Sequence, residues 1–151
     1  MRVFAVITAR SALSTLSAPA ARAQSTVVVT SNARYDDAAV PLASVACYGA
    51  AGSGISTEPV ETFGALPAFP FIGGAALAAG WDAAACGTCW ELAYAQYTVA
   101  VLVIDHASAG FNIPVEAFDQ LHGGTAEHFP SLNATATQVD AARCGGASGA
   151  A

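Results

Sequence analysis

The sequence contains no lysine, and its five basic residues are all arginines. Only 11% of the residues are charged, and eleven of those are acidic. A chain with so little positive charge cannot neutralise a phosphate backbone or an anionic lipid surface, so nucleic acids and membranes are not expected as partners. The surface is expected to be neutral and polar or lightly apolar. Such a surface suits neutral glycans, and the acidic excess suits cation-bearing polymers such as partly deacetylated chitin.

The sequence also lacks any apolar run that approaches the ~20 residues needed to span a bilayer. Val99 to Ile104 is apolar but short, and it is predicted to be a buried strand. Residues 1–23 have the pattern of an export signal, with Arg2 at the positive start, a small apolar region, and a small-x-small ending at Ala21-Arg22-Ala23. We expect cleavage after Ala23; a disordered Ala/Ser-rich tail is the alternative reading of this segment.

Cleavage there would leave two arginines against eleven acidic residues, a net charge of 2 − 11 = −9. Residues 24–144 are then predicted to form one domain of ordinary size, because no linker or internal repeat divides them. Residues 145–151 contain only Gly, Ala and Ser and are expected to be a flexible tail. The protein is predicted to be a secreted monomer, extracellular or in the cell wall, that needs no cofactor and no metal.

Cysteine is scarce but even in number, with four residues at Cys47, Cys86, Cys89 and Cys144. In a short exported chain this predicts two disulfides, for which three pairings are open. A Cys86–Cys89 pair would be a redox arrangement, whereas pairing each with a distant cysteine would close two long loops. The latter would stabilise the fold by ~4 kcal/mol per crosslink in the chain-entropy model. A zinc site of Cys86, Cys89, His122 and His128 is the third option, although its spacing is far from that of a zinc finger.

The pattern of apolar and β-branched residues predicts a β-rich domain. Strands are expected at Val27 to Thr30, Leu42 to Cys47, Trp90 to Tyr94, Tyr97 to Asp105 and Leu132 to Val139. One short helix is expected to start at Gly73-Gly74 and end at Gly80. A second is expected over Pro114 to Leu121, where Pro114 suits a helix start and Gly123-Gly124 ends it.

A series of short motifs in the mature chain closely resembles the cerato-platanins, which are small secreted fungal proteins. The resemblance runs in order from about Val27 to Cys144 without large gaps, and the number of motifs makes it specific. The motifs are Tyr35-Asp36-Asp37, Phe69-Pro70-Phe71-Ile72-Gly73-Gly74, Gly80-Trp81, Cys86-Gly87-Thr88-Cys89-Trp90, Ile104-Asp105-His106-Ala107, Ala109-Gly110-Phe111-Asn112 and Thr137-Gln138-Val139.

This resemblance implies a mainly β fold with two or three short helices, a six-stranded double-ψ β-barrel of the kind found in expansins. It also implies the disulfides Cys47–Cys86 and Cys89–Cys144. Proteins of this family bind chitin and N-acetylglucosamine oligomers, lack hydrolytic activity, loosen polysaccharides and elicit plant defences. The implied partners are therefore cell-wall glycans and a plant receptor.

Asp105 is the leading candidate for a ligand-binding residue, because it ends the buried run from Tyr97 to Ile104 and is placed to face a cleft. Gly110 and Asn112 follow on what is expected to be a loop, and an amide can both donate and accept hydrogen bonds to a sugar. The resemblance implies that Tyr35, Asp36 and Asp37 come near Asp105. His106 is expected to be an orienting or core-edge residue rather than a base, and Trp81 and Trp90 are expected to serve packing rather than to be ligand platforms.

Two other functions remain open from the residues. A glycoside hydrolase on the same barrel would use Asp105 as the acid with Asp36 or Asp37 as its partner, at a carboxyl separation of ~6.5–9.5 Å for inversion. A surface-active cell-wall coat protein is permitted by the low charge and the many Ala and Val residues.

One departure from the family pattern is Asn133-Ala134-Thr135, where the family more often carries Asp. This tripeptide is an acceptor sequence for N-glycosylation. If Asn133 lies on an exposed strand edge it can be modified; the alternative is an ordinary unmodified strand residue.

Overall fold

The computed structural model describes residues 22–51, 53, 55, 61–124 and 129–145. The predicted export signal up to residue 21, the tail from residue 146 and His128 lie outside the described residues. Within the described part, the strands are β1 (Gln24–Ser31), β2 (Ile72–Ala75), β3 (Cys89–Tyr94), β4 (Tyr97–His106), β5 (Phe111–Ile113) and β6 (Leu132–Val139), and the helix is α1 (Val115–His122). Short 3-10 turns lie at Ala33–Asp36, Leu42–Ser44, Phe63–Ala65 and Ala141–Cys144.

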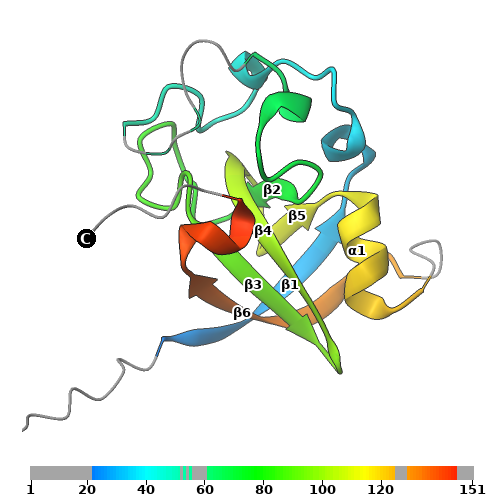
Figure 1. The fold of residues 1–151 in the computed structure, drawn as a ribbon. Helices are drawn as coiled ribbons and strands as arrows, with labels where there is room; N and C mark the ends of the chain where they lie inside the picture. Colours follow the sequence, from blue (N-terminus) through cyan, green and yellow to red (C-terminus); the bar gives the residue numbers. More distant parts are fainter. Residues whose placement is uncertain (1–21, 52, 54, 56–60, 125–128, 146–151) are drawn as a thin grey trace, which may run out of the picture.

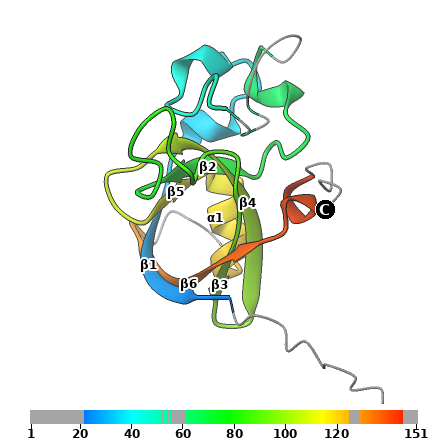
Figure 2. The ribbon, with the colours of Figure 1, turned by 90° about the vertical axis from the view of Figure 1, so that its left-hand side faces the viewer.

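The six strands of the described part close into a barrel in the order β1-β5-β2-β4-β3-β6 (Figure 1). The pairs β1–β5 and β2–β4 are parallel, and the remaining neighbours are antiparallel. Seen along the barrel, the strands surround an interior behind which α1 lies (Figure 2). The closed six-stranded barrel implied by the resemblance is confirmed.

The barrel core follows from the alternation of buried and more exposed residues along most of β4 and β6. In β4, Val99, Val101 and Val103 are buried. In β6, Ala134 and Ala136 are also buried in the barrel, and their small side chains allow the barrel walls to lie close together. Because successive side chains of a strand point to opposite faces, this alternation fixes which residues fill the barrel.

Helix α1 closes one end of the barrel, as its sequence predicts. Phe118 and Leu121 are buried on one face of the helix. Gly123 ends it in a left-handed conformation with φ of 72°, and a Cβ atom there would lie 2.3 Å from the ring of Tyr97. Glycine is required at this position both by its backbone angle and by the close approach of the tyrosine.

Two predicted elements are wrong, and both lie between β1 and β3. Leu42 to Cys47 is a 3-10 turn followed by further turns. Its backbone N–H groups donate to nearby carbonyl oxygens or to the end of β4, so they do not form a ladder with a neighbouring strand. The segment from Gly73-Gly74 to Gly80 is not a helix, since its start belongs to β2. There a Cβ on Gly73 would lie 2.6 Å from the carbonyl oxygen of Asn112, so these glycines serve close backbone packing.

A third correction concerns Gly110-Phe111-Asn112, which was expected to be a loop. Phe111 and Asn112 belong to β5, which pairs with β1 on one side and β2 on the other. The strand is only three residues long, and Pro114 follows it. Nothing in so short a run distinguishes a strand from a loop until its two neighbours are in place.

The disulfides are Cys47–Cys86 and Cys89–Cys144, with Cα–Cα distances of 5.4 and 5.8 Å. The pairing implied by the resemblance is confirmed, and both the Cys86–Cys89 redox pair and the zinc site are ruled out because each cysteine is already bonded. Cys47–Cys86 joins two loop segments beside the end of β4, and Cys89–Cys144 ties the start of β3 to the last 3-10 turn.

Removing the second crosslink by the double change Cys89→Ser and Cys144→Ser is expected to lower the free energy of unfolding by ~4 kcal/mol, because the unfolded chain regains the entropy of a 55-residue loop. Urea denaturation followed by circular dichroism measures the change. A control with both disulfides intact and the exposed Ser108 changed to alanine should keep its midpoint. An unchanged midpoint in the double variant would contradict the prediction.

Candidate functional site

The carboxylate of Asp105 is the centre of a hydrogen-bond cluster at the end of β4. Its Oδ1 atom accepts from the backbone N–H groups of Ala46 and His106 at 2.9 and 2.8 Å. Its Oδ2 atom accepts from the hydroxyl of Tyr35 at 3.1 Å and from the guanidinium of Arg34 at 3.4 Å. The side chain is only 14% exposed. Asp105 therefore joins three segments that are far apart in the sequence.

Tyr35 supplies the buried side of this cluster. Its ring stacks on Phe63 with centroids 6.0 Å apart, and its side chain is almost wholly inaccessible to water. Burial, and next the negative charge of Asp105, raise the pKa of the Tyr35 phenol far above its usual range. The hydroxyl therefore stays protonated and continues to donate to Asp105 well into the alkaline range.

Arg34 covers the outer side of the cluster. Besides Asp105, its guanidinium donates to the carbonyl oxygen of Ser44 at 3.2 Å and to the Ser44 hydroxyl at 2.6 Å. The same group lies 5.8 Å from the ring centroid of Phe63. These contacts hold the guanidinium in place although its side chain is 38% exposed. We refer to Arg34, Tyr35, Ser44, Phe63 and Asp105 as the Asp105 cluster.

Asp36 and Asp37 follow Tyr35 directly but make their hydrogen bonds elsewhere. Asp36 accepts from the backbone N–H groups of Val115 and Glu116 at 2.8 and 3.1 Å, which satisfies the first turn of α1. Asp37 accepts from the backbone N–H of Ala39 at 2.9 Å in an exposed turn. The structure thus brings Tyr35 to Asp105, while the two following carboxylates serve the helix and a turn.

Asn112 lies in the same row of the sheet as Asp105. Gly74 of β2 pairs with Asp105 of β4 on one side and with Asn112 of β5 on the other. Neighbouring strands lie ~4.8 Å apart, so the two backbones are separated by ~10 Å with a glycine between them. The Oδ1 atom of Asn112 is buried and has no hydrogen-bond partner among the described residues.

Gly110 positions β5 rather than contacting the Asp105 cluster. Its φ is 45°, and a Cβ atom there would lie 1.9 Å from the carbonyl oxygen of Val28 in β1. Only glycine permits this approach, because any side chain would collide with the neighbouring backbone. Gly110 therefore sets the position of Asn112, two residues further along the chain.

Exposed apolar side chains lie on the two segments that the Cys47–Cys86 disulfide joins. Trp81 is 64% exposed, and Leu77 and Tyr48 are also exposed. The segment that carries Trp81 is held at the end of β4, where the His106 ring nitrogen Nδ1 lies 3.1 Å from the carbonyl oxygen of Ala78. We call Tyr48, Leu77 and Trp81 the apolar edge.

The prediction that both tryptophans serve packing is therefore wrong for Trp81 and right for Trp90. Trp90 is half-buried, and its ring packs against Phe111 with centroids 5.7 Å apart. Trp81 lies between Gly80 and Asp82 in an Ala/Gly-rich segment with no other large apolar residue after Leu77. Because Trp81 is not part of any apolar pattern, the sequence could have been used to predict that it is exposed.

The described residues contain no group of three or more His, Cys, Asp or Glu side chains that could hold a metal ion. No helix in the described part is long and apolar enough to cross a membrane. Asn133 is exposed near the start of β6 and pairs with Val28 of β1, but β6 is not an edge strand, since it pairs with β3 on its other side. Its glycosylation stays a prediction.

A small β-barrel crosslinked by two disulfides, with the Asp105 cluster at the end of β4, defines the class of protein. The family model for cerato-platanin matches residues 27–146. The chain is 39% identical to "Allergen Asp f 15" of Aspergillus fumigatus over 118 residues, which is 78% of this chain and 76% of that protein. It is 35% identical to "Cerato-platanin" of Ceratocystis fimbriata f. sp. platani, over 68% of this chain and 75% of that one.

Solved structures agree with the sequence comparisons. Cerato-platanin 1 from M. perniciosa superposes with a TM-score of 0.72 at 32% identity, covering 78% of this chain and 98% of that one. The solution structure of "the fungal elicitor Cerato-Platanin" gives a TM-score of 0.64 at 30% identity, covering 78% and 96%. The chain belongs to the cerato-platanin family. Its two disulfides are consistent with an extracellular protein.

Replacing Asp105 by alanine is expected to lower the free energy of unfolding by ~3 kcal/mol, because donors on Arg34, Tyr35 and Ala46 lose their shared acceptor. Chemical denaturation measures the loss. Asp37→Ala, which removes one exposed hydrogen bond, is the control and should change little. Equal stabilities for the two variants would show that the Asp105 cluster does not hold the fold together.

The raised pKa of Tyr35 predicts a loss of stability in alkali. The folded state binds this proton more tightly than the unfolded state, so the contribution is complete below the ordinary tyrosine pKa of ~10 and declines as pH rises above that value. Tyr35→Phe should flatten this part of the curve of unfolding free energy against pH, whereas Tyr48→Phe should keep it. A Tyr35→Phe curve as steep as that of the wild type would contradict the assignment.

Proposed function

We propose that this protein is a secreted, non-catalytic binding protein for cell-wall polysaccharides, with chitin and N-acetylglucosamine oligomers as its ligands. Family membership supports a role outside the cell. The proposal that the protein is non-catalytic rests on the hydrogen bonds of the carboxylates of Asp105 and Asp36. Both oxygens of Asp105 and both oxygens of Asp36 already accept hydrogen bonds from the protein itself.

This state argues against the glycoside hydrolase. An inverting pair needs one carboxyl group that gives a proton and a second that activates a water molecule between them. Both oxygens of Asp36 accept from backbone N–H groups at the N-terminus of α1, so neither is free to activate a water molecule. Both oxygens of Asp105 already accept from donors of the protein, so neither is free to reach the oxygen of a glycosidic bond.

The apolar edge supplies the sugar-binding surface in this proposal. An indole ring offers a flat apolar face for the C–H face of a pyranose, and Trp81 presents most of its surface to solvent. The exposed His106 at the end of β4 and the partly exposed Arg34, which contacts that end through Asp105, can hydrogen-bond sugar hydroxyls and acetamido groups. The Cys47–Cys86 disulfide fixes the two sides relative to each other and so limits the entropy lost on binding.

Two further activities belong to this proposal. A rigid body that binds polysaccharide chains without cutting them can compete with contacts between those chains and loosen a cell wall. Relatives are named as an allergen and as "Heat-stable 19 kDa antigen" of Coccidioides posadasii, and one solved relative is titled a fungal elicitor. Those names support recognition of this protein by a host, including a plant receptor, once it is released. The coat-protein alternative draws on the same exposed apolar side chains.

Retention on insoluble chitin, cellulose and β-glucan tests the proposal. Trp81→Ala is expected to weaken binding to chitin about fivefold to tenfold, since aromatic contacts of this kind are worth ~1–1.4 kcal/mol. Tyr94→Ala, which removes an exposed aromatic residue from the far end of β3, is the control and should bind like the wild type.

Reducing ends released from the same three polymers are measured in parallel at equal protein concentration. None is expected above the level of a heat-inactivated sample. Steady release that is lost in Asp105→Asn would establish hydrolysis and refute the proposal, as would the absence of retention on all three polymers.

A further inference from the structure

Asn133, near the start of β6, begins a tripeptide whose two polar side chains lie on the same face of the barrel. Successive side chains of a strand point to opposite faces, so Asn133 and Thr135 point one way and Ala134 points the other. Ala134 is buried inside the barrel, whereas Asn133 is exposed and Thr135 is partly exposed. The amide and the hydroxyl that an N-glycosylation acceptor requires therefore both lie on the outer surface.

Strand pairing leaves one side of Asn133 open. On one side β1 reaches this level, where Val28 pairs with Asn133. On the other side, the pairing of β6 with β3 extends only as far as Thr135, which lies opposite Ala93. Within the described part of the chain, Asn133 thus has a paired strand on one side only, although β6 as a whole is paired on both sides. A bulky group on its amide can extend over the unpaired side.

The strand partners of the tripeptide are small and uncharged. Val28 lies opposite Asn133, and Thr26 and Ala93 lie in the same row as Thr135. Residues directly opposite each other in a sheet present their side chains on the same face, so these partners are the cross-strand neighbours of the amide and the hydroxyl. None of them is larger than valine, and they leave the amide accessible.

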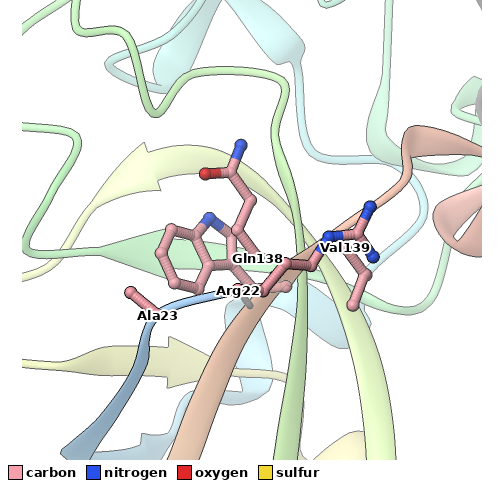
Figure 3. A pocket seen from close by; sticks show the side chains of 5 residues that line it. Arg22, Ala23, Gln138 and Val139 are labelled. Atoms are coloured by element: carbon pink, nitrogen blue, oxygen red, sulfur yellow. The ribbon is translucent and has the colours of Figure 1, made fainter. Parts of the chain in front are cut away.

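Removal of the export signal does not disturb these surroundings. Gln138 and Val139, at the other end of β6, lie beside Ala23, the residue that precedes the predicted cleavage point (Figure 3). Thr26 and Val28, which pair with the acceptor tripeptide, both follow that point and stay in the mature chain. The outer face around Asn133 is therefore the same before and after cleavage.

Asn133 also lies far from the surfaces assigned to polysaccharide binding. Ala93 pairs with Thr98 of β4, which places Thr98 in the same row of the sheet as Thr135. Asp105 is seven residues further along β4, which corresponds to ~23 Å along the strand. Figure 1 shows the hairpin between β3 and β4 at the side of the barrel away from the long connection between β1 and β2. A group on Asn133 would leave the Asp105 cluster uncovered.

We propose that Asn133 is an N-glycosylation site and carries an oligosaccharide in the secreted protein. The inference rests on the secretion that belongs to the proposed function. In the reaction, Nδ2 of Asn133 forms a bond to the anomeric carbon of a lipid-pyrophosphate-linked oligosaccharide, the bond from that carbon to the pyrophosphate oxygen breaks, and one Nδ2 proton leaves. The glycan gives the neutral outer face of β1 and β6 a hydrophilic cover.

Mass spectrometry of the protein secreted by a fungal host tests the site. Asn32 and Asn112 have no Ser or Thr two residues later, so any N-linked glycan reports on Asn133. Treatment with peptide:N-glycosidase is expected to remove the glycan mass and to convert the asparagine of this one peptide to aspartate. Asn133→Gln and Thr135→Ala are each expected to abolish the modification.

Two variants are the controls. Thr135→Ser keeps the hydroxyl of the acceptor sequence and should stay glycosylated. Thr137→Ala removes the next outward-facing threonine of β6 without touching the acceptor sequence, and it should also stay glycosylated. Loss of the glycan in Thr137→Ala would show that the state of the strand, rather than the acceptor sequence, controls the mass, and would contradict the assignment.

An unmodified Asn133 in protein recovered from the medium would overturn the proposal, as would a glycan that persists in Asn133→Gln. Protein that never reaches the medium would contradict secretion, and the site would fall with it. The mass of the secreted protein does not depend on whether it binds chitin, so this proposal and the polysaccharide-binding function fail separately.

Discussion

The carboxylate of Asp105 holds together parts of the chain that have no regular pairing of their own. The long connection between β1 and β2 contains only short 3-10 turns in its described part, and it needs contacts with the barrel to take one position. Asp105 provides them by accepting from Ala46 in that connection and from Arg34 and Tyr35 just after β1. Because its acceptor capacity is filled by the protein, the charge is stabilised in place without a metal or a second carboxylate.

The nearby Cys47–Cys86 bond acts on the same region by covalent means. Cys47 follows Ala46 directly, and its backbone N–H donates to the carbonyl oxygen of Ile104, one residue before Asp105. The crosslink and the hydrogen bonds therefore fix the same strip of backbone. The exposed Trp81 reaches the solvent from a segment that this strip anchors, which explains how a loop made of Ala and Gly can present an aromatic ring in a defined position.

Local sequence predicts the elements whose signal lies within their own residues. The alternation in β4 and β6 and the glycine stop of α1 were enough to place them, and the motif series identified the barrel and both disulfides. β2 and β5 were missed because their strand character comes from neighbours: Gly73 and Gly74 are in a strand only because β4 and β5 press on either side. Tertiary packing there overrides the low strand propensity of glycine.

The candidate site was likewise predictable only in part. The position of Asp105 at the end of a buried strand was predictable, and so was the approach of Tyr35. The use of Asp36 as a cap for α1 was not, because residues 36 and 115 meet only in the folded barrel. The exposure of Trp81 likewise depends on how the connection between β2 and β3 is held against the end of β4, which the spacing of residues along one strand does not reveal.

The order in which the strands pair has a consequence for biosynthesis. β1 is made first, yet its neighbours in the barrel are β5 and β6, which lie roughly eighty to more than one hundred residues later. Contacts this distant in sequence slow folding, and the β-branched run from Val27 to Val29 must wait unpaired until nearly the whole domain has been synthesised. A nascent chain therefore carries an unpaired β-branched segment near its leading end until β5 and β6 have been made.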